Sequence, residues 1–176
     1  MSVNLVIFES YKKEFMNQVF LQLGSNLGDR EQSLIDAINL ISERIGAVVS
    51  KSKVYESAPW RVDGQESYLN QIVKVETEFT ATLTLDCALE IEQILGRVRL
   101  EKWGERLIDI DIIFFNDDII ETSDLCIPHK HMHERNFVLE PLNEIAPEYI
   151  HPKYQKTISE LLRESKDAEK VEEYAV

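Results

Sequence analysis

The run from Leu107 to Phe115 constrains the fold of this chain more than any other segment. Its residues are almost all β-branched or aromatic, which predicts a buried strand. Asp109 and Asp111 interrupt the run, and the alternation of side chains along a strand places both on one face. Adjacent carboxylates repel each other, and a cation held by their oxygens, usually Mg²⁺ near phosphates, removes that repulsion. Alternatively, the pair marks a polar strand edge where each aspartate meets water and a neighbouring arginine.

The segment that leads into this strand, residues 96–106, is rich in cations although the formal net charge of the chain is −13. Arginine suits bidentate contacts with phosphate, and the tryptophan of this segment offers a flat face. A solvated loop with local ion pairs is the alternative, and for Lys102 both interpretations stay open. A cationic loop before an acidic strand is typical of a site for a metal–polyphosphate complex. The candidate phosphate contacts are Arg97, Arg99 and Arg106.

Length and charge bound the class of protein. A chain of 176 residues predicts one domain with a real core, here residues 16–165. Residues 1–15 are expected to be an N-terminal extension, with a native and a non-native origin both left open, and 166–176 a charged, frayed tail. No apolar run approaches a membrane span, and the acidic balance argues against nucleic acid and anionic membranes as partners. Cys87 and Cys126 predict reduced, buried thiols in a cytoplasmic protein, and a monomer is expected.

The order of the expected elements predicts an α+β fold. The order β-α-β-β-α-β is typical of the ferredoxin-like arrangement, with an antiparallel-rich sheet and helices packed on it. Helical segments near 136–145 and 156–164 are expected as C-terminal additions. A threonine, Thr82 or Thr84, is expected to cap the second helix. The core elements are expected at 19–23, 29–45, 47–56, 68–78, 82–95 and 107–115.

Several motifs occur in the order found in one enzyme family. Gly-Arg-Val-Arg-x(3)-Trp-Gly-x-Arg-x(2)-Asp-x-Asp resembles the signature of the 6-hydroxymethyl-7,8-dihydropterin pyrophosphokinases. Further motifs of that family are matched at 24–28, 55–60, 68–70 and 128–142, and the similarity extends from about Val19 to about Leu162. The resemblance implies transfer of diphosphate from ATP to the hydroxymethyl group of the dihydropterin, with release of AMP, in folate biosynthesis.

The resemblance also implies a nucleotide site. Asp109 and Asp111 would hold two Mg²⁺ ions, with ATP as co-substrate, and would act in catalysis with Arg97, Arg99 and Arg106. For His129 a hydrogen-bonded core histidine is the alternative, and for Glu92 a solvated helix face. His131 and His133 are expected at the surface of a turn or short helix rather than in a metal cluster. The implied nucleotide contacts are Glu92, Arg97, Trp103, Arg106, Ile112, His129 and Arg135.

A pterin site is implied in the same way. Tyr68 and Phe137 resemble the two aromatic plates between which the family stacks the pterin ring, although each alone would be interpreted as core. Asn70 offers donors and an acceptor that complement the edge of a pterin. The turn at 24–28 is expected to place Asn26 near the pterin, with ordinary helix entry as the alternative. The implied substrate contacts are Ser57, Ala58, Trp60, Tyr68, Asn70, Trp103 and Phe137.

The sequence departs from the family pattern in two places. The stretch between Arg99 and Trp103 is one residue shorter, which leaves the role of Lys102 open. Ser57 stands where threonine is frequent, and Trp60 where smaller aliphatic residues are frequent, so the fit to the pterin differs on that side. Two other functions remain as rivals: a non-catalytic nucleotide-binding regulator and a two-metal phosphohydrolase. No residue is an obvious general base, so catalysis is expected to rest on alignment and electrostatics.

Overall fold

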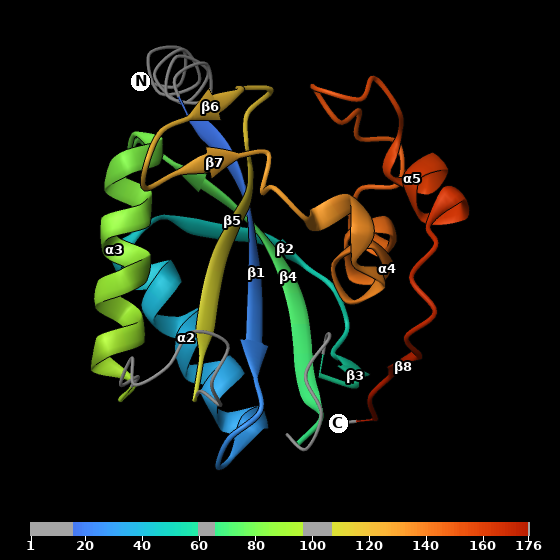
Figure 1. Ribbon diagram of the computed structural model, residues 1–176. Helices are drawn as coiled ribbons and strands as arrows, with labels where there is room; N and C mark the ends of the chain where they lie inside the picture. The colour runs from blue at the N-terminus through green and yellow to red at the C-terminus, as the bar shows by residue number, and fades with distance from the viewer. Residues whose placement is uncertain (1–15, 60–65, 97–106, 176) are drawn as a thin grey trace, which may run out of the picture.

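One antiparallel sheet organises the molecule (Figure 1). The computed structural model describes residues 16–59, 66–96 and 107–175. The strands of this sheet are β1 (Asn17–Ser25), β2 (Ala47–Lys51), β3 (Tyr55–Ser57), β4 (Tyr68–Thr77), β5 (Asp109–Phe115) and β8 (Val171–Glu173). The remaining elements are α2 (Arg30–Arg44), α3 (Ala81–Ile94), β6 (Ile120–Glu121), β7 (Cys126–Ile127), the 3-10 helix η1 (Met132–Glu134), α4 (Asn136–Ile145) and α5 (Ile158–Glu164).

The strand order confirms the ferredoxin-like expectation. The sheet runs β5-β1-β4-β3-β8, with β2 also paired to β4, and every pairing is antiparallel. The first strand therefore lies between the third and the last strands of the β-α-β-β-α-β unit, as in the split βαβ pattern. β6 and β7 form a separate two-stranded ribbon.

The sheet has a different layer on each face. α2 and α3 cover one face, where Leu21, Leu23 and Ile112 belong to a large apolar cluster (Figure 1). α4 and α5 cover part of the other face, where Phe20 and Phe114 belong to a second cluster. Alternation along each strand sends successive side chains to opposite layers, so a single strand serves both.

Local sequence determines where the helices on the first face begin. The side chain of Asp29 accepts a hydrogen bond from the backbone N–H of Gln32 at 3.1 Å and caps α2. Thr80 caps α3 by accepting from the N–H of Leu83, so the prediction of Thr82 or Thr84 as the cap is wrong. Thr84 is instead a buried residue inside the helix, and its hydroxyl donates to the carbonyl of Thr80.

Three expectations differ from the structure. The strand expected over 47–56 is two strands, because Ser52 interrupts it and its hydroxyl accepts from the backbone N–H of Ile72 at 3.0 Å. The tail beyond residue 165 is not frayed: its β8 pairs with β3. Cys87 and Cys126 are free thiols, as expected, but they are half-buried rather than buried.

Within the described ranges, no helix has both the length and the apolarity needed to cross a membrane.

Candidate active site

The two aspartates lie on the face of the sheet opposite α2 and α3. Asp109 and Asp111 are half-buried on β5, while Ile110 and Ile112 between and after them are buried in the apolar cluster beneath the helices. Both carboxylates therefore point away from that cluster and toward the same side, as the alternation predicts. Ile112 is 4% exposed and packs in the same apolar cluster, on the face opposite the two carboxylates.

The strands beside β5 place a glycine beside these carboxylates. Asp109 pairs with Gly24 on β1, and Gly24 pairs with Asn70 on β4, so the three residues form one row across the sheet. A side chain built on Gly24 would meet Asn70 and Tyr68 at ordinary contact distance, 3.9 Å from each. Gly24 is itself buried, and because it carries no side chain its backbone forms the floor of the row between Asp109 and Asn70.

A buried hydrogen-bond network fixes the far side of this floor. Asn70 accepts from Gln22 Nε2 at 3.2 Å and donates to the hydroxyl of Ser57 at 2.9 Å. All three side chains are buried, and the Oε1 atom of Gln22 is buried without a hydrogen-bond partner among the described residues. Because the amide of Asn70 is held on both sides, its orientation is fixed before any ligand arrives. Gln22 is a member of this network that sequence reasoning missed, although a polar residue within an apolar strand was the available signal.

A second group of residues faces the carboxylates from the segment after β7. The backbone N–H of His129 donates to the carbonyl of Ile113 at 3.0 Å and so attaches this segment to β5. Burial, and after it the charges of Arg135 and His131, lower the pKa of His129 to about 4, and the nearby charge of Asp109 opposes the shift. The imidazole is therefore neutral at pH 7 and lies within electrostatic reach of both Asp109 and Arg135.

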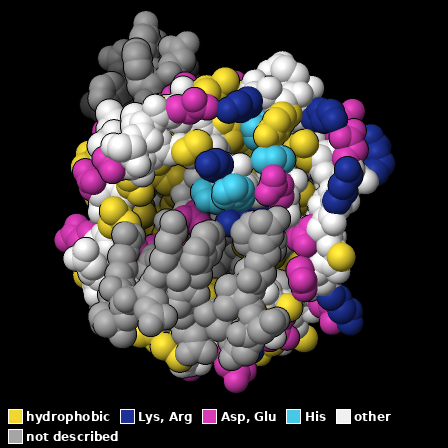
Figure 2. Space-filling view, in the orientation of Figure 1, with side chains coloured by type: hydrophobic (Ala, Val, Ile, Leu, Met, Phe, Trp, Pro, Cys, Tyr) yellow, Lys and Arg dark blue, Asp and Glu magenta, His cyan; other side chains and the backbone are white. Residues whose placement is uncertain are grey.

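Arg135 and Phe137 lie together at the start of α4. The guanidinium carbon of Arg135 is 5.6 Å from the centre of the Phe137 ring, and Arg135 is only 7% exposed. A cation above an aromatic ring is held in place by the ring quadrupole. The surface view shows histidine side chains gathered in the middle of this face, with acidic side chains beside them (Figure 2). His131 and His133 are half-buried residues at and next to η1, as expected.

Glu92 supports the acidic strand from the other side. It is 2% exposed on α3, and its Oε1 atom accepts from the backbone N–H of Ile110 at 2.8 Å. The alternative of a solvated helix face is therefore wrong. Since Ile110 lies between the two aspartates, this hydrogen bond fixes the stretch of β5 that carries them.

The turn after β1 is closed by a buried amide. Asn26 is buried, and its Nδ2 donates to the carbonyl of Glu66 at 3.4 Å, so it joins this turn to the segment that enters β4. Ala58 is exposed beyond β3. Other predicted site residues lie outside the described residues: Trp60, Arg97, Arg99, Lys102, Trp103 and Arg106.

The described donors fit a hard cation only in part. Asp109 and Asp111 supply carboxylate oxygens, which Mg²⁺ prefers, on one side of one strand. Among the described residues, no group of three or more His, Cys, Asp or Glu side chains could hold a metal ion. A pair of carboxylates with waters and phosphate oxygens is nevertheless the usual protein contribution to a Mg²⁺–nucleotide complex.

Comparison with known proteins decides the family. The sequence model of 7,8-dihydro-6-hydroxymethylpterin-pyrophosphokinase (HPPK) matches residues 20–147. The chain belongs to this family. It is similar to the 2-amino-4-hydroxy-6-hydroxymethyldihydropteridine pyrophosphokinase of Haemophilus influenzae, at 39% identity over 86% of this chain and 95% of that protein. The protein of the same name from Bacillus subtilis is 41% identical over 74% of this chain and 78% of that protein.

Solved structures support the fold of this pyrophosphokinase. Wild-type HPPK-DHPS from Plasmodium falciparum superposes with a TM-score of 0.67 at 18% identity, covering 84% of this chain and 44% of that one. Another HPPK-DHPS structure, in complex with substrates, gives a TM-score of 0.70 over 84% of this chain and 43% of that chain. This chain thus spans less than half of those longer proteins, and at such low identity the likeness concerns the fold alone.

Proposed function

We propose that this protein transfers diphosphate from ATP to the hydroxymethyl group of 6-hydroxymethyl-7,8-dihydropterin and releases AMP, in folate biosynthesis. It is an ATP-dependent diphosphotransferase by family. One feature of the site carries the proposal beyond the family. Asp109 and Asp111 lie on the same face of the sheet as the floor at Gly24, so a charged chain held at the carboxylates would lie beside a ring placed over that floor.

The reaction exchanges one phosphorus–oxygen bond for another. The hydroxymethyl oxygen bonds to the β-phosphorus of ATP, the bond from that phosphorus to the α–β bridging oxygen breaks, and AMP leaves. His129 is a weak base because its pKa is about 4, so the hydroxyl proton passes to water or phosphate rather than to this imidazole. The contribution of the protein is therefore alignment and charge stabilisation.

We assign the nucleotide side of the site to the carboxylates and the cations around them. Asp109 and Asp111 would hold Mg²⁺, two ions by family resemblance, which supplies positive charge to the phosphates when bound. Arg135 is a fixed guanidinium near His129, suited to phosphate oxygens. The proposal completes this side with Arg97, Arg99, Trp103 and Arg106. The three arginines would offset negative charge on the transferred group. Glu92 and Ile112 would act indirectly, through the backbone of β5.

We assign the pterin side to the floor at Gly24 and its borders. Tyr68 and Phe137 would hold the ring between them, since stacking on a flat heterocycle suits exposed aromatic faces. Asn70 and Ser57 are already oriented by the network that includes Gln22, and they border the floor where the edge of the ring would lie. Ala58, Trp60 and Trp103 belong to this side as well in the proposal.

Two broader expectations accompany this assignment. We propose that the enzyme works as a monomer in the cytoplasm, where free thiols such as Cys87 and Cys126 stay reduced. Size-exclusion chromatography with light scattering tests the first expectation, and localisation of a tagged chain in cells tests the second.

The reaction is tested by measuring AMP release from ATP with and without the dihydropterin. The proposal expects AMP only when both substrates are present. Calorimetry with a non-hydrolysable ATP analogue, before and after addition of a pterin, then separates the rivals. A nucleotide-binding regulator would bind ATP without forming AMP and without an effect of pterin. A phosphohydrolase would release phosphate in the absence of pterin.

A further inference from the structure

Helix α4 begins without a cap from its own neighbourhood. Arg135 occupies the N-cap position, where Ser, Thr, Asp or Asn is usual, and its side chain makes no capping hydrogen bond. Its guanidinium is buried above the ring of Phe137 instead. The N-cap side chain therefore contacts Phe137 instead of capping the start of the helix. The first backbone N–H groups of α4 need hydrogen-bond acceptors from another part of the chain.

Asp167 supplies that partner from the C-terminal tail. Its Oδ2 atom accepts from the backbone N–H of Asn136, the first residue of α4, at 2.8 Å. Its carbonyl oxygen accepts from Nδ2 of Asn136 at 3.0 Å. A carboxylate at a helix N-terminus satisfies a free N–H group and also interacts favourably with the helix dipole. Both contacts hold the residue that lies between Arg135 and Phe137.

The same tail also holds the other border of the site. Beyond Asp167, β8 pairs with β3, and Val171 lies opposite Ser57. The backbone N–H of Tyr174 donates to the carbonyl of Val54 at 2.8 Å, and its hydroxyl donates to Glu31 at 2.8 Å. Without β8, β3 would be an edge strand, since its other neighbour is β4.

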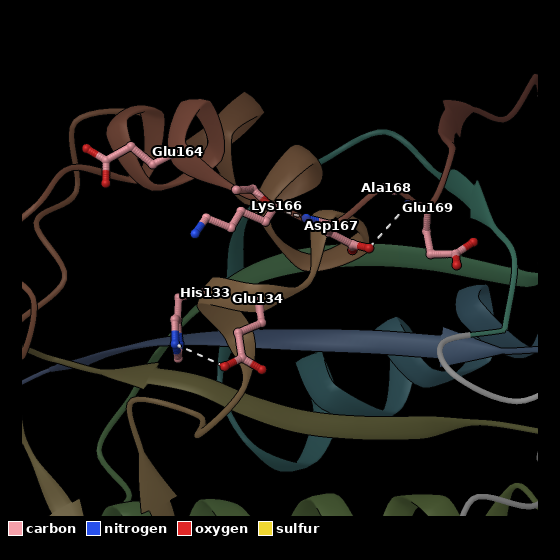
Figure 3. A pocket seen from close by; sticks show the side chains of 8 residues that line it. His133, Glu134, Glu164, Lys166, Asp167, Ala168 and Glu169 are labelled. Carbon is pink, nitrogen blue, oxygen red and sulfur yellow. Dashed lines mark hydrogen bonds and ion pairs between the residues drawn. The ribbon is translucent and has the colours of Figure 1, made fainter.

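We infer that residues 165–174, the C-terminal strap, position the two borders of the substrate site, and that Asp167 is a positioning residue for Arg135 and Phe137. This inference rests on the proposed function, because it assigns those two side chains to substrate. The strap lies beyond the stretch 20–147 that matches the family. It borders a hollow of about 480 Å³ next to η1, where the carboxylate of Asp167 also accepts from the backbone N–H of Glu169 (Figure 3).

The test measures steady-state kinetics of the full-length chain, well below its unfolding temperature. Asp167→Ala should raise the KM for the dihydropterin about fivefold, and kcat should fall by a smaller factor. The reason is that the site would be correctly assembled in a smaller fraction of the molecules, while an assembled site would react at the normal rate. Asp167→Asn keeps the acceptor oxygen and should stay within about twofold of wild type. Lys170→Ala is the matched control and should behave as wild type, because Lys170 lies in the strap and its ammonium pairs with Glu172, at 2.6 Å, within the strap itself.

A second variant keeps the test decisive if Asp167→Ala does not fold. Asn136→Pro deletes both hydrogen bonds to Asp167 but keeps the start of α4, since proline is favoured at the first helical position and Arg135 is already extended. It should give the same rise in KM. A wild-type KM in either folded variant, even with a lower melting temperature, would overturn the inference, as would failure of Asp167→Asn to restore binding. If wild type itself forms no AMP, the proposed function fails instead.

Discussion

The two faces of the sheet use the same strands for opposite purposes. On β5, Ile110 and Ile112 enter the closed apolar layer under α2 and α3, while Asp109 and Asp111 enter the other face. Among the described residues, α4 and α5 cover part of that other face, around Phe20 and Phe114. The apolar layer under α2 and α3 supplies stability, and the proposed site lies on the opposite face, beside the part that α4 and α5 cover.

The division depends on alternation with period two. On β1, Leu21 and Leu23 enter the closed face, while Gln22 between them enters the opposite face. A rigid, well-packed layer behind the site keeps the polar residues in register. Substitutions on the two faces should therefore separate catalysis from stability.

The largest effect is expected at the carboxylates on the opposite face. Asp109→Ala and Asp111→Ala should each lower kcat by about a thousandfold or more, because each removes a ligand for Mg²⁺ and charge stabilisation for the transferred group. The fold should remain, since both side chains are half-buried outside the apolar layer. An AMP-release assay measures the loss, and Asp118→Ala, in the exposed turn after β5, serves as the control. Normal turnover of either variant would refute the metal assignment.

The next effect is expected on the closed face. Leu21→Ala removes a fully buried side chain and should lower the free energy of unfolding by about 2–5 kcal/mol, through lost burial and the cavity left behind. Its kcat should stay close to that of wild type at a temperature where the variant is folded. Urea unfolding and the AMP-release assay on one preparation measure both quantities. Loss of activity in the folded variant would show that the two faces are coupled.

Acidification should weaken the packing at the covered part of the opposite face. His151 is 2% exposed, its Nδ1 accepts from the backbone N–H groups of Lys153 and Tyr154, and its ring contacts Phe114 edge to face. Burial, and after it the neighbouring His133, lower the pKa of His151 to about 4. Below pH 6.5 the unfolded chain therefore binds a proton that the folded chain does not bind until about pH 4.

Stability should thus fall as the pH falls from 6.5 toward 4. Between pH 7 and pH 5, His151 should account for a loss of about 2 kcal/mol in the free energy of unfolding. Urea unfolding at the two pH values measures the loss, and His151→Asn should show a smaller difference between them. An equal difference in wild type and His151→Asn would show that this imidazole is not the group responsible.

The smallest effect on stability is expected at the floor of the site. Gly24→Ala places a methyl group 3.9 Å from Asn70 and Tyr68, so the free energy of unfolding should change by less than about 1 kcal/mol. The KM for the dihydropterin should rise about tenfold, because the methyl group occupies the surface on which the ring would lie.

Gly46→Ala, in the connection between α2 and β2, is the control for Gly24→Ala. A side chain there would lie 2.2 Å from the carbonyl oxygen of Glu76, so the variant should lose about 1–3 kcal/mol of stability and keep its KM. Thermal melts and initial rates for the pair measure both effects. The floor assignment fails if Gly24→Ala binds the dihydropterin as wild type does.

Much of the fold and part of the site follow from local sequence. The apolar run at 107–115 determined that Asp109 and Asp111 share a face, because alternation is a property of any strand. Motif resemblance identified the family, which the comparisons confirm. The hydrogen bond from the Ile110 backbone to Glu92 could not be predicted from the sequence. The sequence of a helix does not show which strand the carboxylate of one of its glutamates will contact.

By itself, the sequence determined the β-α-β-β-α-β order of the core and the pair of carboxylates on one strand face, since each depends on periodicity within one segment. Only the tertiary structure decided that the charged tail pairs with β3 and that Asp167 caps α4 next to Arg135. The physical reason is that a hydrogen bond between residues 31 positions apart has no local pattern. It exists only because the packed sheet and helices bring the two ends of that stretch together.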